Sequence, residues 1–296
     1  MSRLSPAFHA LQQRLRTPAT RGAVATGVPG VQFFWVTEKV GRAPLIYSAG
    51  IVIIGQGHKI GHLGDRTFRY DEDTYLVLGV PMPFECETHP AADGPLLGLR
   101  IDIDLTALHS LVASLGLRPS RGETGTPPKG LEPARMDEDM IEATARLLKC
   151  LEDPADSRIL GPAAVQEIVY RALRGEQGRV LSSLTQHGTP YAAVARALDR
   201  IHGDFRQSIS VEMLAEENAM SVSSFHRAFK RVTGDSPLQY LKKIRLDKAK
   251  GLLVNQGMRV NTVAFEVGYE SPSQFSREFK RYFKVPPSEA GSLAYT

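Results

Sequence analysis

Two stretches of the chain, fifty residues apart, repeat one pattern. Residues 221–237 read SVSSFHRAFKRVTGDSP, and residues 271–287 read SPSQFSREFKRYFKVPP. With one laid over the other, the first serine and the last proline coincide, as do Phe, Arg, Phe, Lys and Arg between them. Phenylalanines at i and i+4 mark one buried stripe of a helix. Each copy therefore predicts a short basic helix, anchored by two aromatics, with its cations on other faces.

A second helix is predicted before each copy. Ser210 is placed to cap a helix over residues 211–218, and residues 261–267 form the corresponding segment before the second copy. Gly268 suits a left-handed helix end, and Ser271 suits the start of the next helix. Helix, short turn and basic helix is the helix-turn-helix arrangement, whose second helix enters the major groove of DNA.

The two copies are joined by a predicted helix over residues 237–255, which carries an apolar stripe and five Lys and Arg residues. Such a helix would be about 28 Å long at about 1.5 Å per residue. That length is close to the ~34 Å between successive major-groove faces. One chain is therefore expected to span two adjacent turns of duplex.

Residues 192–290 resemble the DNA-binding domain of the AraC/XylS family of bacterial transcription regulators, which has two helix-turn-helix units joined by a long helix. The stretch VAFEVGYESPSQFSREFKRYFKVPP carries most of the resemblance. Lys284 departs from the family pattern, which usually has Gly after the aromatic. Because this position ends a helix, we expect a modest penalty at the helix C-terminus.

The resemblance implies which residues meet DNA. Those expected to face bases are Ser223, His226 and Arg227 in the first copy and Ser273, Gln274 and Arg277 in the second. Those expected to meet phosphates are Lys230, Arg231, Lys280 and Arg281. Arg can bind guanine and Gln can bind adenine through paired hydrogen bonds, whereas phosphate contacts add affinity with little sequence information. The alternative is that these basic residues only form a solvated helix face.

Charge is distributed unevenly along the chain. Residues 191–296 contain sixteen Lys and Arg against eleven Asp and Glu, a net charge of +5, compared with +4 for all 296 residues. The positive excess thus lies where DNA is expected. Neither an apolar run of about 18 residues nor the apolar core of a signal peptide is present, so we expect a cytoplasmic protein without membrane association. Two cysteines provide neither a disulfide framework nor a zinc site.

The first hundred residues predict short strands separated by turn residues, which favours a sandwich or barrel. The string APLIYSAGIVIIGQGHKIGHLGDRTFRYDEDTYLVLGVPMPFECET resembles the cupin-like amino-terminal domain of one subgroup of AraC regulators. We therefore predict an α+β chain with a cupin-like barrel or sandwich, a helical connector and an all-α domain with two helix-turn-helix units. The predicted bounds are 1–116 with strands from about 30, a linker at 117–136, a connector and possible dimerisation region at 137–190, and the DNA-binding domain at 191–296.

Candidate sensing residues are Cys86, His58 and His89. Cys86 is a thiol on a predicted strand, and as a thiolate it would attack aldehydes or oxidants. The flanking Glu85 and Glu87 should point to the opposite face of the strand. The alternatives are an inert buried cysteine and structural histidines. The spacing of the histidines does not match a cupin metal site, so neither a metal nor a cofactor is predicted.

The resulting hypothesis is a sequence-specific transcriptional regulator, not an enzyme, whose amino-terminal domain senses a small molecule or a reactive stress compound. The resemblance favours an activator and a homodimer, with promoter DNA, RNA polymerase and an unidentified small-molecule effector as partners. Two alternatives stay open. One is a metal-dependent cupin enzyme carrying a DNA-binding domain, and the other is a barrel that serves only interaction and dimerisation.

Overall fold

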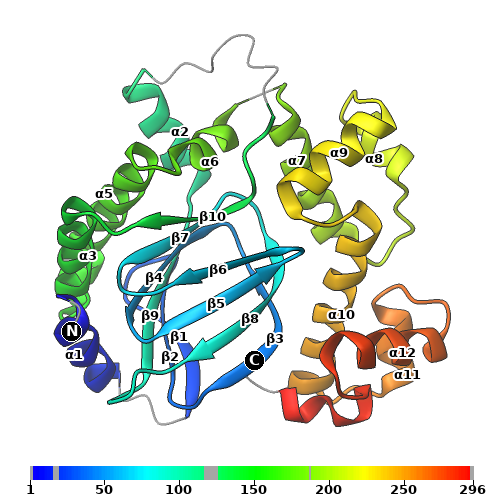
Figure 1. The fold of residues 1–296 in the computed structure, drawn as a ribbon, viewed down its shortest axis with the longest axis horizontal. Helices are drawn as coiled ribbons and strands as arrows, with labels where there is room; N and C mark the ends of the chain where they lie inside the picture. Colours follow the sequence, from blue (N-terminus) through cyan, green and yellow to red (C-terminus); the bar gives the residue numbers. More distant parts are fainter. Residues whose placement is uncertain (1–2, 16–19, 117–125, 187, 294–296) are drawn as a thin grey trace.

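The computed structural model describes residues 3–15, 20–116, 126–186 and 188–293 of the chain (Figure 1). Within these residues, two antiparallel sheets face one another. The six-stranded sheet has the order β1-β2-β9-β4-β7-β10, with β1 at Arg21–Ala25, β2 at Val31–Val36, β4 at Gly50–Gln56, β7 at Thr74–Leu78, β9 at Leu96–Asp102 and β10 at Leu131–Arg135. The four-stranded sheet has the order β3-β8-β5-β6, with β3 at Val40–Tyr47, β5 at His58–Leu63, β6 at Arg66–Tyr70 and β8 at Met82–His89. The prediction of a sandwich or barrel is confirmed in this open two-sheet form.

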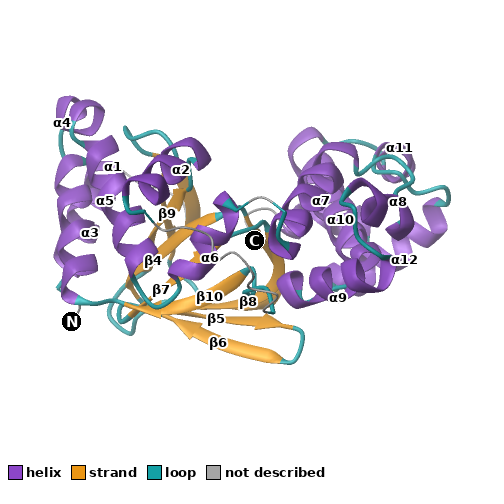
Figure 2. Cartoon of the chain, turned by 90° about the horizontal axis from the view of Figure 1, so that it is seen from above, coloured by secondary structure: helices purple, strands orange, loops and turns teal. Residues whose placement is uncertain are grey.

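The six-stranded sheet is buried on both faces, which explains the nearly continuous apolar run of β4. Ile51 and Ile53 point to the helices outside the sheet, whereas Val52 and Ile54 point toward the four-stranded sheet. The helices on the outer side are seen at the left of Figure 2. They are α1 (Ser5–Leu15), α2 (Leu105–Ser114), α3 (Glu138–Cys150), α4 (Pro154–Ile159), α5 (Gly161–Arg174) and α6 (Gly178–Ser182). The predicted connector thus covers this sheet.

Two predictions in this half differ from the structure. Strands were expected from about residue 30, but α1 and β1 precede that point. A linker was expected over residues 117–136, but β10 pairs with β7 and forms the edge of the sheet. Leu131 and Ala134 are buried there, and an edge strand tolerates Pro133, which lacks an N–H to donate. Residues 117–125 of the expected linker lie outside the described residues.

The carboxy-terminal half is helical and has two helix-turn-helix units, as predicted. Its helices are α7 (Pro190–Asp204), α8 (Val211–Glu217), α9 (Val222–Thr233), α10 (Pro237–Gln256), α11 (Val260–Glu266) and α12 (Pro272–Phe283), after a 3-10 turn at Ser183–Thr185 and before another at Pro287–Leu293. The side chains of Ser210, Ser221, Ser236 and Ser271 cap α8, α9, α10 and α12 by accepting a hydrogen bond from the N–H three residues on. No helix among the described residues combines the length and apolar character that crossing a membrane requires.

The two halves are in direct contact. The Tyr240 hydroxyl on α10 donates a hydrogen bond of 2.8 Å to the carbonyl of Pro81, just before β8. His202 Nε2 lies 2.8 Å from the same hydroxyl and therefore donates to it. Burial, with a smaller effect of Lys248, lowers the pKa of His202 to about 4, so the ring is neutral at pH 7. The Gly130 N–H adds a backbone hydrogen bond of 2.8 Å to the Val232 carbonyl of α9.

The two helix-turn-helix units form the same left-handed turns with different residues. Gly268 follows α11 with φ of 86°, and Ala219 occupies the corresponding place after α8 with φ of 52°. Gly234 ends α9 with φ of 79°, and Lys284 ends α12 with φ of 68°. The expected penalty at Lys284 thus has a structural basis, because a side chain disfavours the left-handed region.

Replacing either strained residue by glycine should stabilise the protein. We expect Ala219→Gly and Lys284→Gly each to raise the free energy of unfolding by about 0.5–1 kcal/mol, since the left-handed strain exceeds the extra entropy of glycine in the unfolded chain. Thermal unfolding followed by circular dichroism measures this. Gly268→Ala serves as the opposite case and should destabilise, because its new Cβ would lie 2.6 Å from the Arg206 carbonyl oxygen. Lower melting temperatures for both glycine variants would contradict the assignment of strain.

Candidate nucleic-acid interface and sensory cavity

The two helices that carry the repeated sequence, α9 and α12, are called the reading helices below. Each is fixed by a pair of phenylalanines, Phe225 and Phe229 in α9 and Phe275 and Phe279 in α12, all with 0% of their surface exposed. The ring centroids of the pairs are 5.7 Å and 5.6 Å apart. The sequence repeat is therefore a repeat of packing geometry. In Figure 1, α9 lies at the upper end of α10, and α12 lies farther down, alongside it.

All of the residues predicted to meet DNA are exposed. In α9 these are Ser223, His226, Arg227, Lys230 and Arg231, and in α12 they are Ser273, Gln274, Arg277, Lys280 and Arg281. Within the described residues, the side chains of two of them hydrogen-bond to other residues of the protein. Arg231 Nε donates to the Pro127 carbonyl at 3.4 Å, and Gln274 Nε2 donates to Glu278 Oε1 at 3.2 Å. Each reading helix thus presents polar and cationic groups to solvent, while its aromatic face is buried.

Glu278 was not among the predicted site residues, but it connects three side chains of the second helix-turn-helix unit. Besides Gln274, its carboxylate accepts hydrogen bonds of 2.9 Å from Lys242 Nζ of α10 and from the Tyr269 hydroxyl in the turn. Burial acts to raise the pKa of Glu278, but these donors outweigh it, and the pKa is lowered. The carboxylate therefore holds α12 against α10 and orients Gln274. One feature of the sequence could have identified Glu278. The second copy of the repeat has this acidic residue at the position where the first copy has Ala228.

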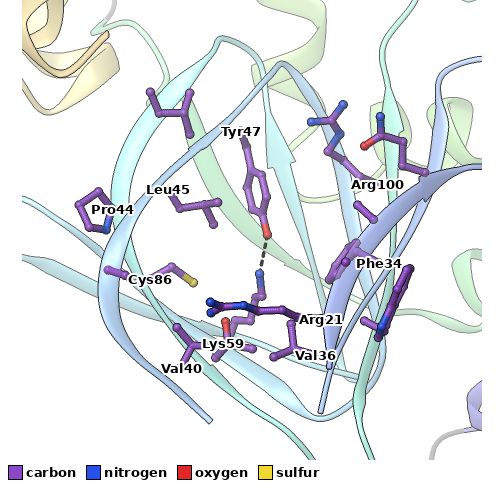
Figure 3. Close-up of a pocket in the computed structure, with 17 residues that line it drawn as sticks. Arg21, Phe34, Val36, Val40, Pro44, Leu45, Tyr47, Lys59, Cys86 and Arg100 are labelled. Atoms are coloured by element: carbon purple, nitrogen blue, oxygen red, sulfur yellow. Dashed lines mark hydrogen bonds between the residues drawn. The ribbon is translucent and has the colours of Figure 1, made fainter. Parts of the chain in front are cut away.

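A cavity of about 360 Å³ lies between the two sheets and is lined from β1, β2, β3, β5, β8 and β9 (Figure 3). Cys86 is one of its lining residues and has 4% of its surface exposed. Burial raises the pKa of the Cys86 thiol, and this outweighs the opposing effects of Lys59 and the Tyr70 hydroxyl, which lies 3.4 Å from Sγ. The reactive thiolate is therefore disfavoured at neutral pH.

The candidate sensing residues are not all brought together. His58 and His89 lie on the outer face of the four-stranded sheet and stack with ring centroids 4.6 Å apart, whereas Cys86 points inward.

Glu87 also points outward, as expected, and His62 and His89 place ring nitrogens 2.8 Å and 3.2 Å from its carboxylate. These contacts lower the pKa of Glu87. Burial, followed by Arg69 and His89, lowers the pKa of His58. No three His, Cys, Asp or Glu residues within the described ranges are arranged to hold a metal ion.

Lys59 was also not among the predicted sensing residues. In β5 the alternation of the strand sends His58, Ile60 and His62 outward and buries Lys59 on the side of Leu63. The alternation of side chains along a strand could have identified Lys59, because it places this lysine on the inner face of the sheet, among mostly apolar residues.

Removing the charge of Glu278 should weaken the second helix-turn-helix unit. We expect Glu278→Gln to lower the free energy of unfolding by about 1–2 kcal/mol at pH 7, because Lys242 and Tyr269 lose a charged acceptor. The lowered pKa of Glu278 contributes stability that is present above the ordinary Glu pKa of about 4.3 and lost as pH falls through the folded value. The difference between wild type and variant should therefore shrink on acidification. Denaturant unfolding at several pH values measures it.

Glu270→Gln is the matched control, because Glu270 is exposed in the turn just before α12. It removes the same charge and should leave the stability almost unchanged. Equal effects of the two substitutions at pH 7 would contradict the role given to Glu278.

Curated relatives match about half of the chain. The transcriptional activator RhaS of Escherichia fergusonii is 29% identical over 155 residues, which are 52% of this chain and 55% of that protein. The lactose operon transcription activator of Staphylococcus xylosus is 26% identical over 151 residues, covering 51% and 53% of the two chains. The match thus spans little more than half the length of each relative.

Solved structures of similar shape cover nearly the whole chain. A ligand-free ToxT variant from Vibrio cholerae has a TM-score of 0.61 at 12% identity, covering 92% of this chain and all of that one. Wild-type ToxT with bound unsaturated fatty acid has a TM-score of 0.56 at 12% identity, covering 88% and 93%. Because the sequence identity is 12%, the similarity to ToxT shows a shared fold alone.

Two family models match the two halves of the chain. The model described as helix-turn-helix domain matches residues 214–291, which include both reading helices. The model described as AraC-type transcriptional regulator N-terminus matches residues 27–180, more than half of the chain. The chain therefore belongs to the family of AraC-type transcriptional regulators.

Proposed function

We propose that this protein regulates transcription by binding promoter DNA in a sequence-specific way through both reading helices. The observation that carries the proposal is the pair of exposed cationic helices with matching phenylalanine anchors. Ser223, His226, Arg227, Ser273, Gln274 and Arg277 are proposed to face bases, and Lys230, Arg231, Lys280 and Arg281 are proposed to meet phosphates. Their exposure supports these roles.

The proposed direction of regulation is activation, with RNA polymerase as a partner. The printed names of two relatives, the activator RhaS and the lactose operon activator, support this direction. A homodimer is proposed as the working form. Its support is the apolar surface at Ile159 and Leu160, whose exposed fractions are 72% and 52%. The cytoplasm is the proposed location, because promoter DNA is the proposed partner.

The amino-terminal domain is proposed to bind a small-molecule effector in the cavity between the sheets. Cys86 lines this cavity, while His58 and His89 lie outside it, which favours Cys86 as the effector contact among the three. ToxT, which shares the fold, has been solved with unsaturated fatty acid bound. No observation on the described residues favours the alternative of a metal-dependent enzyme.

Base contacts and phosphate contacts should respond differently to substitution. We expect Arg227→Ala and Arg277→Ala each to weaken binding to a cognate promoter fragment about 5- to 150-fold, and to relax preference at particular base positions. Lys230→Ala and Lys280→Ala should weaken cognate and random fragments alike, and should lower the dependence of log affinity on log salt by about one unit each. Fluorescence anisotropy at several salt concentrations measures both effects.

Lys149→Ala is the control for loss of a positive charge, because Lys149 is exposed on α3, far along the chain from the reading helices. It should leave DNA affinity unchanged. Equal affinity of the wild type for promoter and random fragments would overturn the proposed function.

The role of Cys86 has its own test. If Cys86 triggers the response by reacting with a stress compound, Cys86→Ser should keep promoter binding and abolish induction of a reporter gene in cells. If Cys86 only lines the cavity, the isosteric serine should leave induction largely intact. The raised pKa of the thiol favours the second outcome. Loss of promoter binding itself would contradict both roles.

A further inference from the structure

The cavity between the sheets has three cationic side chains and no carboxylate among its described lining residues. Lys59, Arg21 and Arg100 supply the charge. The rest of the lining is mostly apolar and includes Phe34 and Trp35 of β2. A volume of about 360 Å³ lies at the small end of the ~300–1000 Å³ that ligand sites in proteins usually have. The cavity is therefore built for a small molecule with an apolar body.

Lys59 is the most deeply buried of these three cations. Only 7% of its surface is exposed, and within the described residues its ammonium has one hydrogen-bond partner, the Tyr47 hydroxyl at 2.9 Å (Figure 3). Its ammonium lies over the rings of Phe34 and Tyr47, 5.1 Å and 5.5 Å from their centroids. No described carboxylate forms an ion pair with it. An ammonium without a counter-charge is costly to bury, so the site favours an anion.

A second cation is also incompletely satisfied. Arg100 of β9 forms an ion pair with Asp102 at 3.2 Å, but its Nε is buried and has no hydrogen-bond partner among the described residues. Arg100 and Lys59 lie on different sheets and both line the cavity. A ligand between the sheets can therefore meet positive charge from both sides.

The protonation of Lys59 decides between an ionic and a covalent ligand. Burial by itself lowers the pKa of Lys59, but the Tyr47 hydroxyl and the Cys86 thiol outweigh it and raise the pKa above its usual value. The ammonium form is stabilised by the hydrogen bond that it donates to the Tyr47 hydroxyl and by the two aromatic rings beside it. A Schiff base with an aldehyde needs the neutral amine, whereas an ion pair needs the ammonium.

We propose that the effector is a small organic carboxylate, whose apolar body fills the cavity between the sheets and whose carboxylate pairs with Lys59. This identifies the chemical class of the effector and rests on the proposed function only for its effect on DNA. Strand β3 supplies six of the lining residues and also contacts α12. A carboxylate that fills the cavity thus contacts the strand that packs against the second reading helix. Through this strand, its binding changes the affinity of the protein for DNA.

The proposal is tested first by binding without DNA. Phenylacetate and octanoate are the probes, and phenylacetamide and octanamide are their uncharged counterparts. Thermal shift and calorimetry at about 5 mM probe detect sites with dissociation constants near 1 mM or tighter. We expect at least one carboxylate to bind wild type, with its amide at least about tenfold weaker. Absence of binding by both carboxylates, or equal binding of acid and amide, would overturn the proposal.

Two variants separate a ligand contact from a structural role. Lys59→Met removes the charge at similar size, and should weaken carboxylate binding about 10- to 100-fold. Because it also removes an unpaired buried charge, its ligand-free melting temperature should equal or exceed that of wild type. Lys59→Arg keeps the charge and should retain part of the binding. A folded Lys59→Met variant that binds the carboxylate as tightly as wild type would overturn the proposal.

A second measurement distinguishes failure of the ligand assignment from failure of the proposed function. Promoter affinity of wild type and Lys59→Met is compared with and without the carboxylate that binds. We expect equal affinities without carboxylate and a carboxylate response in wild type only. A carboxylate that binds at Lys59 without changing promoter affinity would overturn its role as effector. Failure of wild type to bind any promoter would overturn the proposed function and leave the ligand assignment standing.

Discussion

Burial of two phenylalanines on each reading helix is the constraint that organises the helix-turn-helix half. A fully buried Phe stabilises a fold by about 1.5–3 kcal/mol, so the aromatic stripe fixes which way each helix is turned. Since Phe225 and Phe229 occupy one face, Arg227 and Lys230 must lie on others, and the same holds fifty residues later. The exposed cations are therefore a consequence of core packing, repeated by the repeated sequence.

The two units differ in what they pack against. The core of the first unit is continuous with the interior between the sheets, where one cluster of buried apolar side chains includes Phe84 of β8 and Phe229 of α9. The core of the second unit, around Phe275 and Phe279, is a separate cluster. Tyr240 marks the junction, because it is fully buried and donates to the Pro81 carbonyl. The first unit is thus built into the amino-terminal domain, whereas the second is held mainly by α10, by Glu278 and by its contact with β3.

The helix-turn-helix units were predictable because their signals are local. Spacing of phenylalanines, serine caps and Gly268 depend on neighbours along the chain, and the structure agrees with each. The sheet order was not predictable, and β10 was mistaken for a linker, because Pro133 and its surroundings become a strand only through pairing with β7. The roles of Lys59 and Glu278 could not be predicted for the same reason. A lysine beneath aromatic rings and a carboxylate shared by three donors acquire their roles from residues distant in sequence.

The central claim is that α9 and α12 enter successive major grooves of one duplex. Hydroxyl-radical footprinting of the full chain on a bound promoter fragment tests it most directly. The account predicts two protected patches on one face of the DNA, with centres about 10–10.5 base pairs apart for each bound chain. One patch per chain, or two patches on opposite faces of the duplex, would contradict it.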